Sequence, residues 1–274
     1  MKKRASPFVL SFTFAPCCSI LRIAPKLPAK LGEVVMSSVA PAFRNHKFSF
    51  DKGELGMHEN LMTCVIVGRR EPLLVGDDSD QTEAHAICIK PDVPHRVVIQ
   101  EGGAEIVYLD GVKLDENAPK FGDLPDVWQN LPQAIEARDH IALAGYRQTL
   151  NRDDIPSDAG VMRIVERLYK DPFERLSQLD LAQELQLERT LAMRHFKSTT
   201  GQTFRKFKIW AAMMYAVDAA FNGEKIGLAG IQAGFSDAAH MTRTAATLFG
   251  ITPTQGLSGL SAFTSIEAHP HSAS

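Results

Sequence analysis

Ala229 to Pro253, with the sequence AGIQAGFSDAAHMTRTAATLFGITP, decides how the C-terminal part of this chain folds. Gly234 and Phe235 form a corner at its centre, and glycine supplies the positive φ that a tight connection between two helices needs. Ser236 or Asp237 follows as a candidate N-cap, whose side-chain oxygen would accept hydrogen bonds from the first turn of a new helix. A short helix, a glycine turn and a second capped helix are typical of a helix-turn-helix, whose second helix fits the DNA major groove.

A second unit of this kind is expected upstream. Ser177 can cap a first helix, the turn falls near Gln186, and the next helix opens at Glu188 or Arg189. Phe204 to Phe221 then carries apolar residues at helical spacing and predicts one long linking helix. A stiff linker would fix the spacing of the two reading helices, so that they enter successive major-groove turns about 34 Å apart.

Both units resemble the DNA-binding domain of the AraC/XylS family of bacterial transcription regulators. The resemblance implies a cytoplasmic, sequence-specific DNA-binding regulator that is not an enzyme and that has no cofactor, metal or catalytic residues. Three residues of the first unit depart from the family pattern: Gln186 replaces the turn glycine, Glu188 a capping serine and Ala192 a core leucine. The matching residues are Ser177, Leu181, Ala182, Arg194, Phe196, Lys197 and Gly201 in the first unit, and Gly234, Phe235, Asp237, His240, Arg243, Phe249, Gly250, Thr252 and Pro253 in the second.

Helical i, i+3, i+4 spacing places a set of candidate DNA-binding residues on one side of each second helix. Arg194 can form two hydrogen bonds with guanine, whereas Lys197 suits a phosphate contact. Leu191 and Phe196 fall toward the other side and should belong to the core. The alternative interpretation is an ordinary solvated helix face. The candidate DNA-binding residues are Arg189, Thr190, Met193, Arg194 and Lys197 in the first unit, and Ala238, Ala239, Thr242 and Arg243 in the second.

The charge of the chain is only a weak indication that it binds nucleic acid. The whole chain has a net charge of −2, so there is no global basic excess. Residues 176–255 contain eight basic and six acidic residues, and six of the eight basic residues lie between 189 and 208. We therefore expect loss of Arg194 to weaken DNA binding more than loss of Arg243.

Short apolar runs separated by turn residues fill residues 43–112 and predict a small β-sandwich or barrel. The segment IKPDVPHRV, residues 89–97, resembles the second cupin segment of AraC-type sensor domains. An inward-facing pocket would bind a small effector, with His95, His58 and His85 as candidate effector-binding residues. The rival interpretation is a metal-dependent cupin enzyme that uses these histidines and Glu59. His58 and Glu59 are adjacent, and on a strand they would point to opposite faces.

The expected fold class is therefore α+β with two domains, a small cupin-like β-barrel followed by an all-α domain with tandem helix-turn-helix motifs. Apolar stripes in the connector either pair two subunits in a homodimer or pack within the chain. A degenerate regulator that acts by protein contact is a further alternative. The expected segments are a disordered or mis-assigned N-terminal extension at 1–40, a cupin-like effector or oligomerisation domain at 41–112, a helical connector at 113–155, the DNA-binding domain at 156–260 and a disordered tail at 261–274.

The remaining expectations concern the ends of the chain, its compartment and its partners. Lys2, Lys3 and Arg4 precede an apolar run that superficially resembles a secretory signal, and Met36 is an alternative start. No run of 18 or more apolar residues occurs, so no membrane-spanning helix is predicted. The four cysteines fit a reduced, cytoplasmic protein. The expected partners are double-stranded DNA, RNA polymerase and a small-molecule effector of unknown identity.

Overall fold

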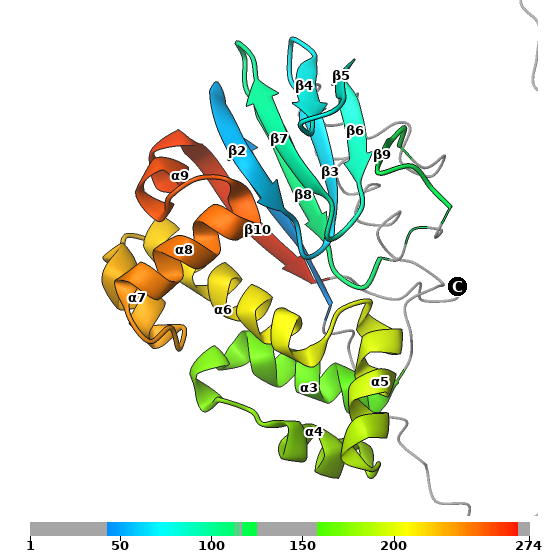
Figure 1. Ribbon diagram of the computed structural model, residues 1–274. Helices are drawn as coiled ribbons and strands as arrows, with labels where there is room; N and C mark the ends of the chain where they lie inside the picture. Colours follow the sequence, from blue (N-terminus) through cyan, green and yellow to red (C-terminus); the bar gives the residue numbers. More distant parts are fainter. Residues whose placement is uncertain (1–42, 113, 115–116, 125–157, 268–274) are drawn as a thin grey trace, which may run out of the picture. The chain divides into compact units, whose positions relative to one another are not determined.

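The computed structural model describes residues 43–112, 114, 117–124 and 158–267 (Figure 1). In these ranges the chain is α+β, as expected, with strands first and helices after them. The predicted extension at 1–40 and most of the predicted connector, residues 125–155, lie outside the described residues. The strands are β1 Arg44–Phe50, β2 Gly53–Glu59, β3 Thr63–Gly68, β4 Leu73–Gly76, β5 Gln81–Ala84, β6 Ala86–Ile89, β7 Pro94–Ile99, β8 Ala104–Leu109, β9 Phe121–Gly122 and β10 Leu260–Glu267.

The strands form two open antiparallel sheets. One has six strands in the order β10-β1-β8-β3-β6-β9, and the other has four in the order β2-β7-β4-β5. The run from Ala84 to Ile89, which reads as one strand in the sequence, divides at His85 between β5 and β6, so its two ends enter different sheets. Because the sheets are open, the closed barrel expected over residues 41–112 is not confirmed.

Central strands of the six-stranded sheet bury both of their faces. In β3, Cys64 and Ile66 enter the main core, whereas Val65 and Val67 enter a smaller cluster with Leu124. This division follows the two-residue alternation of side chains along a strand. It also explains why β3 is a continuous apolar run instead of an alternating one.

The helices confirm the predicted caps and turns. Ser177 caps α4 in a reciprocal arrangement with Asp180, and Asp237 caps α8 by accepting the His240 N–H at 2.7 Å. Gly234, before α8, has a φ of +91°, the left-handed conformation that the turn requires. None of the helices among the described residues is both long and apolar enough to cross a membrane. The helices are α3 Ala159–Lys170, a 3-10 turn at Pro172–Glu174, α4 Gln178–Leu185, α5 Arg189–Thr200, α6 Phe204–Phe221, α7 Ile226–Gln232, α8 Ala238–Phe249 and α9 Pro253–Gly259.

The prediction of a disordered tail from residue 261 is wrong for residues 261–267. Leu260–Glu267 form β10, an edge strand antiparallel to β1, and the Phe263 ring packs against Phe48 at a centroid distance of 4.9 Å. The partner strand lies more than 200 residues earlier in the chain, so no local pattern could have indicated the pairing. Similarly, β9 lies in the segment 113–155 that we expected to be a helical connector, and it pairs with β6.

A buried polar cluster joins the six-stranded sheet to the helices. The carboxylate of Asp110, which follows β8, accepts hydrogen bonds from the Trp210 Nε1–H of α6 at 3.0 Å, from the Tyr169 hydroxyl of α3 and from the Arg44 N–H at 3.1 Å. Burial raises the pKa of Asp110 to about 7, although these hydrogen bonds act in the opposite direction. The His46 Nε2 lies 3.3 Å from the Tyr169 hydroxyl and extends the cluster into β1. One buried carboxyl thus connects the sheet with two helices.

Candidate nucleic-acid interface and effector pocket

Helix α5 presents most of its predicted DNA-binding residues to solvent. Arg189, Thr190, Arg194 and Lys197 are exposed, and Met193 is partly buried against the core. The inward side of the same helix is formed by the fully buried Ala192 and Phe196. The structure therefore places all five candidate residues on one helix, four of them on its solvent-exposed side and Met193 at the edge of the core.

Leu191 is an exception to the predicted core. Its side chain is 52% exposed, so the expectation that it packs inward is wrong. The inward stripe runs through Ala192 and Phe196, four residues apart, and Leu191 lies one residue, or about 100°, around the helix from Ala192. The outward surface of α5 therefore combines cations with one exposed leucine.

Gln186 and Glu188, which replace the turn glycine and the capping serine of the family pattern, form the same turn and cap in the structure. Gln186 adopts the left-handed conformation, with φ 52°, at the position where the family has glycine. Glu188 caps α5, because its Oε2 accepts the Thr190 N–H at 2.8 Å and the Leu191 N–H at 3.3 Å. His195 also lies 2.6 Å from the Asp158 carboxylate at the N-cap of α3, which fixes the rotation of α5. The first helix pair is therefore well formed without the usual residues.

Helix α8 presents a less polar outward surface. Ala238, Ala239 and Arg243 are exposed, and Thr242 is partly buried with its hydroxyl donating to the Ala238 carbonyl at 2.8 Å. Arg243 is thus the single residue of this predicted set that offers charged donors. The opposite side of α8 is buried through Met241, Ala245 and Leu248.

The second helix pair touches the sheet at the end of α8. The Gly56 N–H of β2 donates to the Gly250 carbonyl, the C-cap of α8, at 3.0 Å. Gly250 has a φ of +70°, and a Cβ at this position would overlap the backbone of Gly56. Glycine is therefore needed at Gly250 both for its conformation and for the close approach of β2.

The structure brings two of the three predicted effector-binding histidines together. His58 and His95 are buried cross-strand neighbours in β2 and β7, with ring centroids 4.2 Å apart. Each Nδ1–H donates to a backbone carbonyl, that of Gly56 at 2.8 Å and that of Val93 at 2.7 Å. Burial, followed by the neighbouring His95, lowers the pKa of His58 to about 3, and burial also lowers the pKa of His95, so the site favours the neutral form of each ring.

The other two residues of the metal-enzyme alternative lie elsewhere. His85 and Glu59 are exposed, and His85 lies in the turn between β5 and β6. Among the described residues no group of three or more histidine, cysteine, aspartate or glutamate side chains converges as a metal site would require. The four side chains named from the sequence are therefore not gathered in one place.

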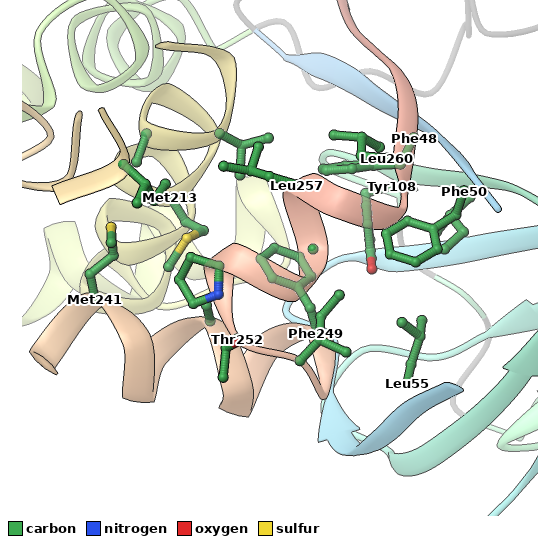
Figure 2. Close-up of a pocket in the computed structure, with 18 residues that line it drawn as sticks. Phe48, Phe50, Leu55, Tyr108, Met213, Met241, Phe249, Thr252, Leu257 and Leu260 are labelled. Atoms are coloured by element: carbon green, nitrogen blue, oxygen red, sulfur yellow. The ribbon is translucent and has the colours of Figure 1, made fainter. Parts of the chain in front are cut away.

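An apolar cavity of about 70 Å³ lies where the sheets meet α6, α8 and α9 (Figure 2). Phe48, Tyr108 and Leu55 line it from the strands, and Met213 and Phe249 line it from the helices. No local pattern in the sequence indicates this cavity, because residues that line it, such as Phe48 and Leu260, lie more than 200 positions apart in the chain. None of His58, His85 and His95 lines it.

A second, larger hollow of about 580 Å³ lies between α5 and one end of the six-stranded sheet. Arg194 and Lys197, two of the predicted DNA-binding residues, line its helix side, and Lys90 lines its sheet side. The predicted reading surface of α5 thus continues into a cleft that also involves the sheet.

The comparisons with known proteins concern the fold. No family model and no curated protein sequence matches this chain. An apo ToxT variant from Vibrio cholerae strain SCE256 is similar at 11% identity with a TM-score of 0.52, over 80% of this chain and 98% of that one. ToxT from Vibrio cholerae O395 is similar at 12% identity with a TM-score of 0.52, over 81% and 99%. ToxT from the same strain bound to (E)-4-(8-methylnaphthalen-1-yl)but-3-enoic acid is similar at 11% identity with a TM-score of 0.50, over 78% and 98%.

ToxT is an AraC-family regulator with an N-terminal effector-binding domain and a C-terminal DNA-binding domain. The resemblance inferred from the sequence motifs is therefore confirmed at the level of the fold, across nearly the full length of the ToxT chains.

Proposed function

We propose that this chain is a sequence-specific DNA-binding transcription regulator of the AraC type. In this proposal α4–α5 and α7–α8 are the two helix-turn-helix units, and α6 links them (Figure 1). The observation that carries the proposal is the placement of the candidate residues. In both pairs the second helix is capped, buries one side and leaves its arginine, Arg194 or Arg243, exposed. The ToxT-like fold supports the same conclusion.

The two reading helices would contribute differently. Arg194 can form two hydrogen bonds with guanine in the major groove, and Lys197 and Arg189 would contact phosphates. Thr190 and Met193 could then contact thymine methyl groups. In the second unit Ala238 and Ala239 would allow close approach, and Thr242 would contact a base edge through its methyl group, since its hydroxyl is used within α8. Arg243 would supply the charged contact there.

We also propose a small, mainly apolar effector. The supporting observation is the cavity between the strands and α6, α8 and α9, whose walls are aromatic and aliphatic (Figure 2). The ligand of the third ToxT structure combines an apolar ring system with a carboxylic acid. An effector that enters the cavity would shift the population of sheet–helix arrangements, because the cavity adjoins the contact between Gly56 and Gly250. The buried pair His58–His95 is the other candidate effector site, with the exposed His85 now separate from it.

We propose two further partners, a second copy of this chain and RNA polymerase. The homodimer would form through the connector, most of which lies outside the described residues. Contact with RNA polymerase is expected of a transcription regulator of this class. A cytoplasmic location follows from the same class.

Selection of bound fragments from genomic DNA tests the proposed function. Purified protein should enrich a defined sequence, and fluorescence anisotropy should then show tighter binding to that sequence than to a scrambled duplex of equal length. Arg194→Ala should reduce this preference by about 10-fold or more, since a good two-bond contact with guanine contributes about 1–3 kcal/mol. Enrichment of no sequence above the level found for bulk DNA would overturn the proposal.

A further inference from the structure

The apolar cavity between the strands and α6, α8 and α9 is lined, in the described part of the chain, by uncharged side chains (Figure 2). No arginine, lysine, histidine or acidic residue is among these described residues. The polar side chains among them are Tyr108 and Thr252. The Tyr108 hydroxyl forms a hydrogen bond with the Cys64 thiol, and the Thr252 hydroxyl donates to the Gln255 side-chain oxygen at 2.8 Å. Both hydroxyls therefore already have partners within the chain.

This wall disfavours an anionic ligand. An ionised carboxylate that leaves water needs a cation or several hydrogen-bond donors to offset the loss of its hydration. The aromatic and aliphatic residues described around the cavity supply no cation, and their two hydroxyls are already hydrogen-bonded. The ligand of the third ToxT structure carries a carboxylic acid, so the chemistry of this cavity favours a different class of ligand.

The size of the cavity limits the ligand to a few carbon atoms. Its volume of about 70 Å³ is less than the roughly 150 Å³ of an apolar cavity that binds benzene. Figure 2 shows Met213 of α6 and Met241 of α8 on the helix side of the cavity, and both are buried. Because a methionine side chain is unbranched and flexible, these two residues can move to admit a somewhat larger ligand.

We propose that the effector of this chain is an uncharged, hydrocarbon-like molecule of about three to six carbon atoms that binds in this cavity. Phe48 and Leu55 would contact it from the strands, and Met241 and Phe249 from α8. A bound molecule would therefore favour the arrangement in which α8 lies against the sheet. The role as an effector rests on the proposed function, whereas the binding itself does not.

NMR titration of the full-length protein, with methyl-labelled methionine and without DNA, tests the class of ligand. Isobutene and acetate are a matched pair of probes, because they have the same branched skeleton and differ in charge, and benzene is the larger probe. We expect saturable shifts of the Met213 and Met241 methyl signals with both hydrocarbons. Acetate should bind at least about 100-fold more weakly than isobutene. Acetate binding as tight as that of isobutene, or no saturation with either hydrocarbon, would refute the proposal.

Ala245→Leu fills the cavity, because Ala245 of α8 lines it and leucine extends the side chain by an isopropyl group. Ala239→Leu is the matched control, since Ala239 lies on the same helix but is exposed and does not line the cavity. Ala245→Leu should weaken isobutene binding by at least about 10-fold, and Ala239→Leu should leave it unchanged within about twofold. Equal affinities in these two variants would refute the site. Ala216→Val, which fills the cavity from α6, replaces Ala245→Leu if thermal melts show that the latter is unfolded.

A DNA arm separates this inference from the proposed function. Saturating isobutene should change the affinity of the wild type for its selected DNA sequence by about 5-fold or more, and should not change that of Ala245→Leu. Absence of DNA binding in every sample would refute the proposed function and leave the NMR result standing. An unchanged DNA affinity of the wild type with the cavity occupied would refute the role as an effector.

Discussion

Replacement of Asp110 by alanine should destabilise the chain at the junction between sheet and helices. The Asp110 carboxylate is buried and accepts hydrogen bonds from Trp210, Tyr169 and the Arg44 backbone. Alanine would leave these three donors without an acceptor in a place that water does not reach. Each unsatisfied buried donor costs about 1–3 kcal/mol, and removal of the buried charge offsets part of the sum. We expect a net loss of about 3 kcal/mol in the free energy of unfolding.

Asp110→Asn separates the charge from the hydrogen bonds. The folded-state pKa of Asp110 is about 7, above the value near 3.9 of an unfolded chain. The stability that the protonated carboxyl contributes is therefore fully present below about pH 4 and is lost as the pH rises through 7. The loss amounts to about 4 kcal/mol at most, at 1.36 kcal/mol per pKa unit. Asparagine does not titrate, so the stability of this variant relative to wild type should rise by up to that amount between pH 4 and pH 8.

The buried histidines change the stability with pH in the opposite direction. Both the wild type and the Asp110→Asn variant contain them. Burial, followed by the charge of Arg44, lowers the pKa of His46 to about 3, and His58 has a similarly lowered pKa. Their contribution is present above pH 6.5 and is lost as the pH falls toward 3. The wild-type profile is a sum of both effects, but the difference between Asp110→Asn and wild type isolates the carboxyl.

Urea unfolding at pH 5 and pH 8 measures these differences. Asp78→Asn is the control, because Asp78 is 88% exposed and its ion pair with Arg96 lies at the surface. It should change stability by less than about 0.5 kcal/mol at both pH values. A cost of less than about 1 kcal/mol for Asp110→Ala would contradict the hydrogen-bond argument. An unchanged difference between Asp110→Asn and wild type at the two pH values would contradict the argument from burial.

Three further predictions concern the helix pairs. Gln186→Gly should raise the free energy of unfolding by about 1 kcal/mol, because glycine adopts the left-handed conformation without the Cβ penalty; a lower melting temperature would contradict this. Arg194→Ala should weaken DNA binding more than Arg243→Ala in fluorescence anisotropy, because the other cations cluster around the first unit; the reverse order would overturn the ranking. In urea unfolding, Gly250→Ala should lower the free energy of unfolding more than Gly223→Ala. Both glycines have a positive φ, but only Gly250 lies against the β2 backbone. Equal losses in the two variants would show that a Cβ at position 250 does not overlap this backbone.

The features that the sequence could predict are those that depend on neighbouring residues. Ser177 and Asp237 cap their helices because a short side-chain oxygen reaches an N–H two or three residues later. The departures at Gln186 and Glu188 show the limit of comparison with a family pattern. A glutamine can occupy the left-handed position at some cost, and a glutamate can cap, so a missing consensus residue does not mean a missing turn. One of the observations that suggested a degenerate regulator, the missing turn glycine, no longer supports it, because Gln186 forms the turn.

The features that the sequence could not predict depend on contacts between distant segments. Leu191 is exposed because α5 packs against α4 and α6 through Ala192 and Phe196, and helical spacing alone does not show which side of a helix meets its neighbours. The pairing of β10 with β1 joins the two ends of the described chain, and its residues alternate too weakly to stand out. The apolar cavity near Phe249 exists only after strands and helices have packed.

These long-range contacts change the role that the sequence suggested for α6. A stiff linker was expected to set the spacing of the two reading helices, but each helix pair also has its own attachment to the strands. The first is attached through Gln202 at the end of α5, and the second through Gly250 at the end of α8 and through β10. If the chain binds DNA as proposed, the strands take part in setting the distance between the helices. An effector in the cavity would then act on the second attachment and change this spacing.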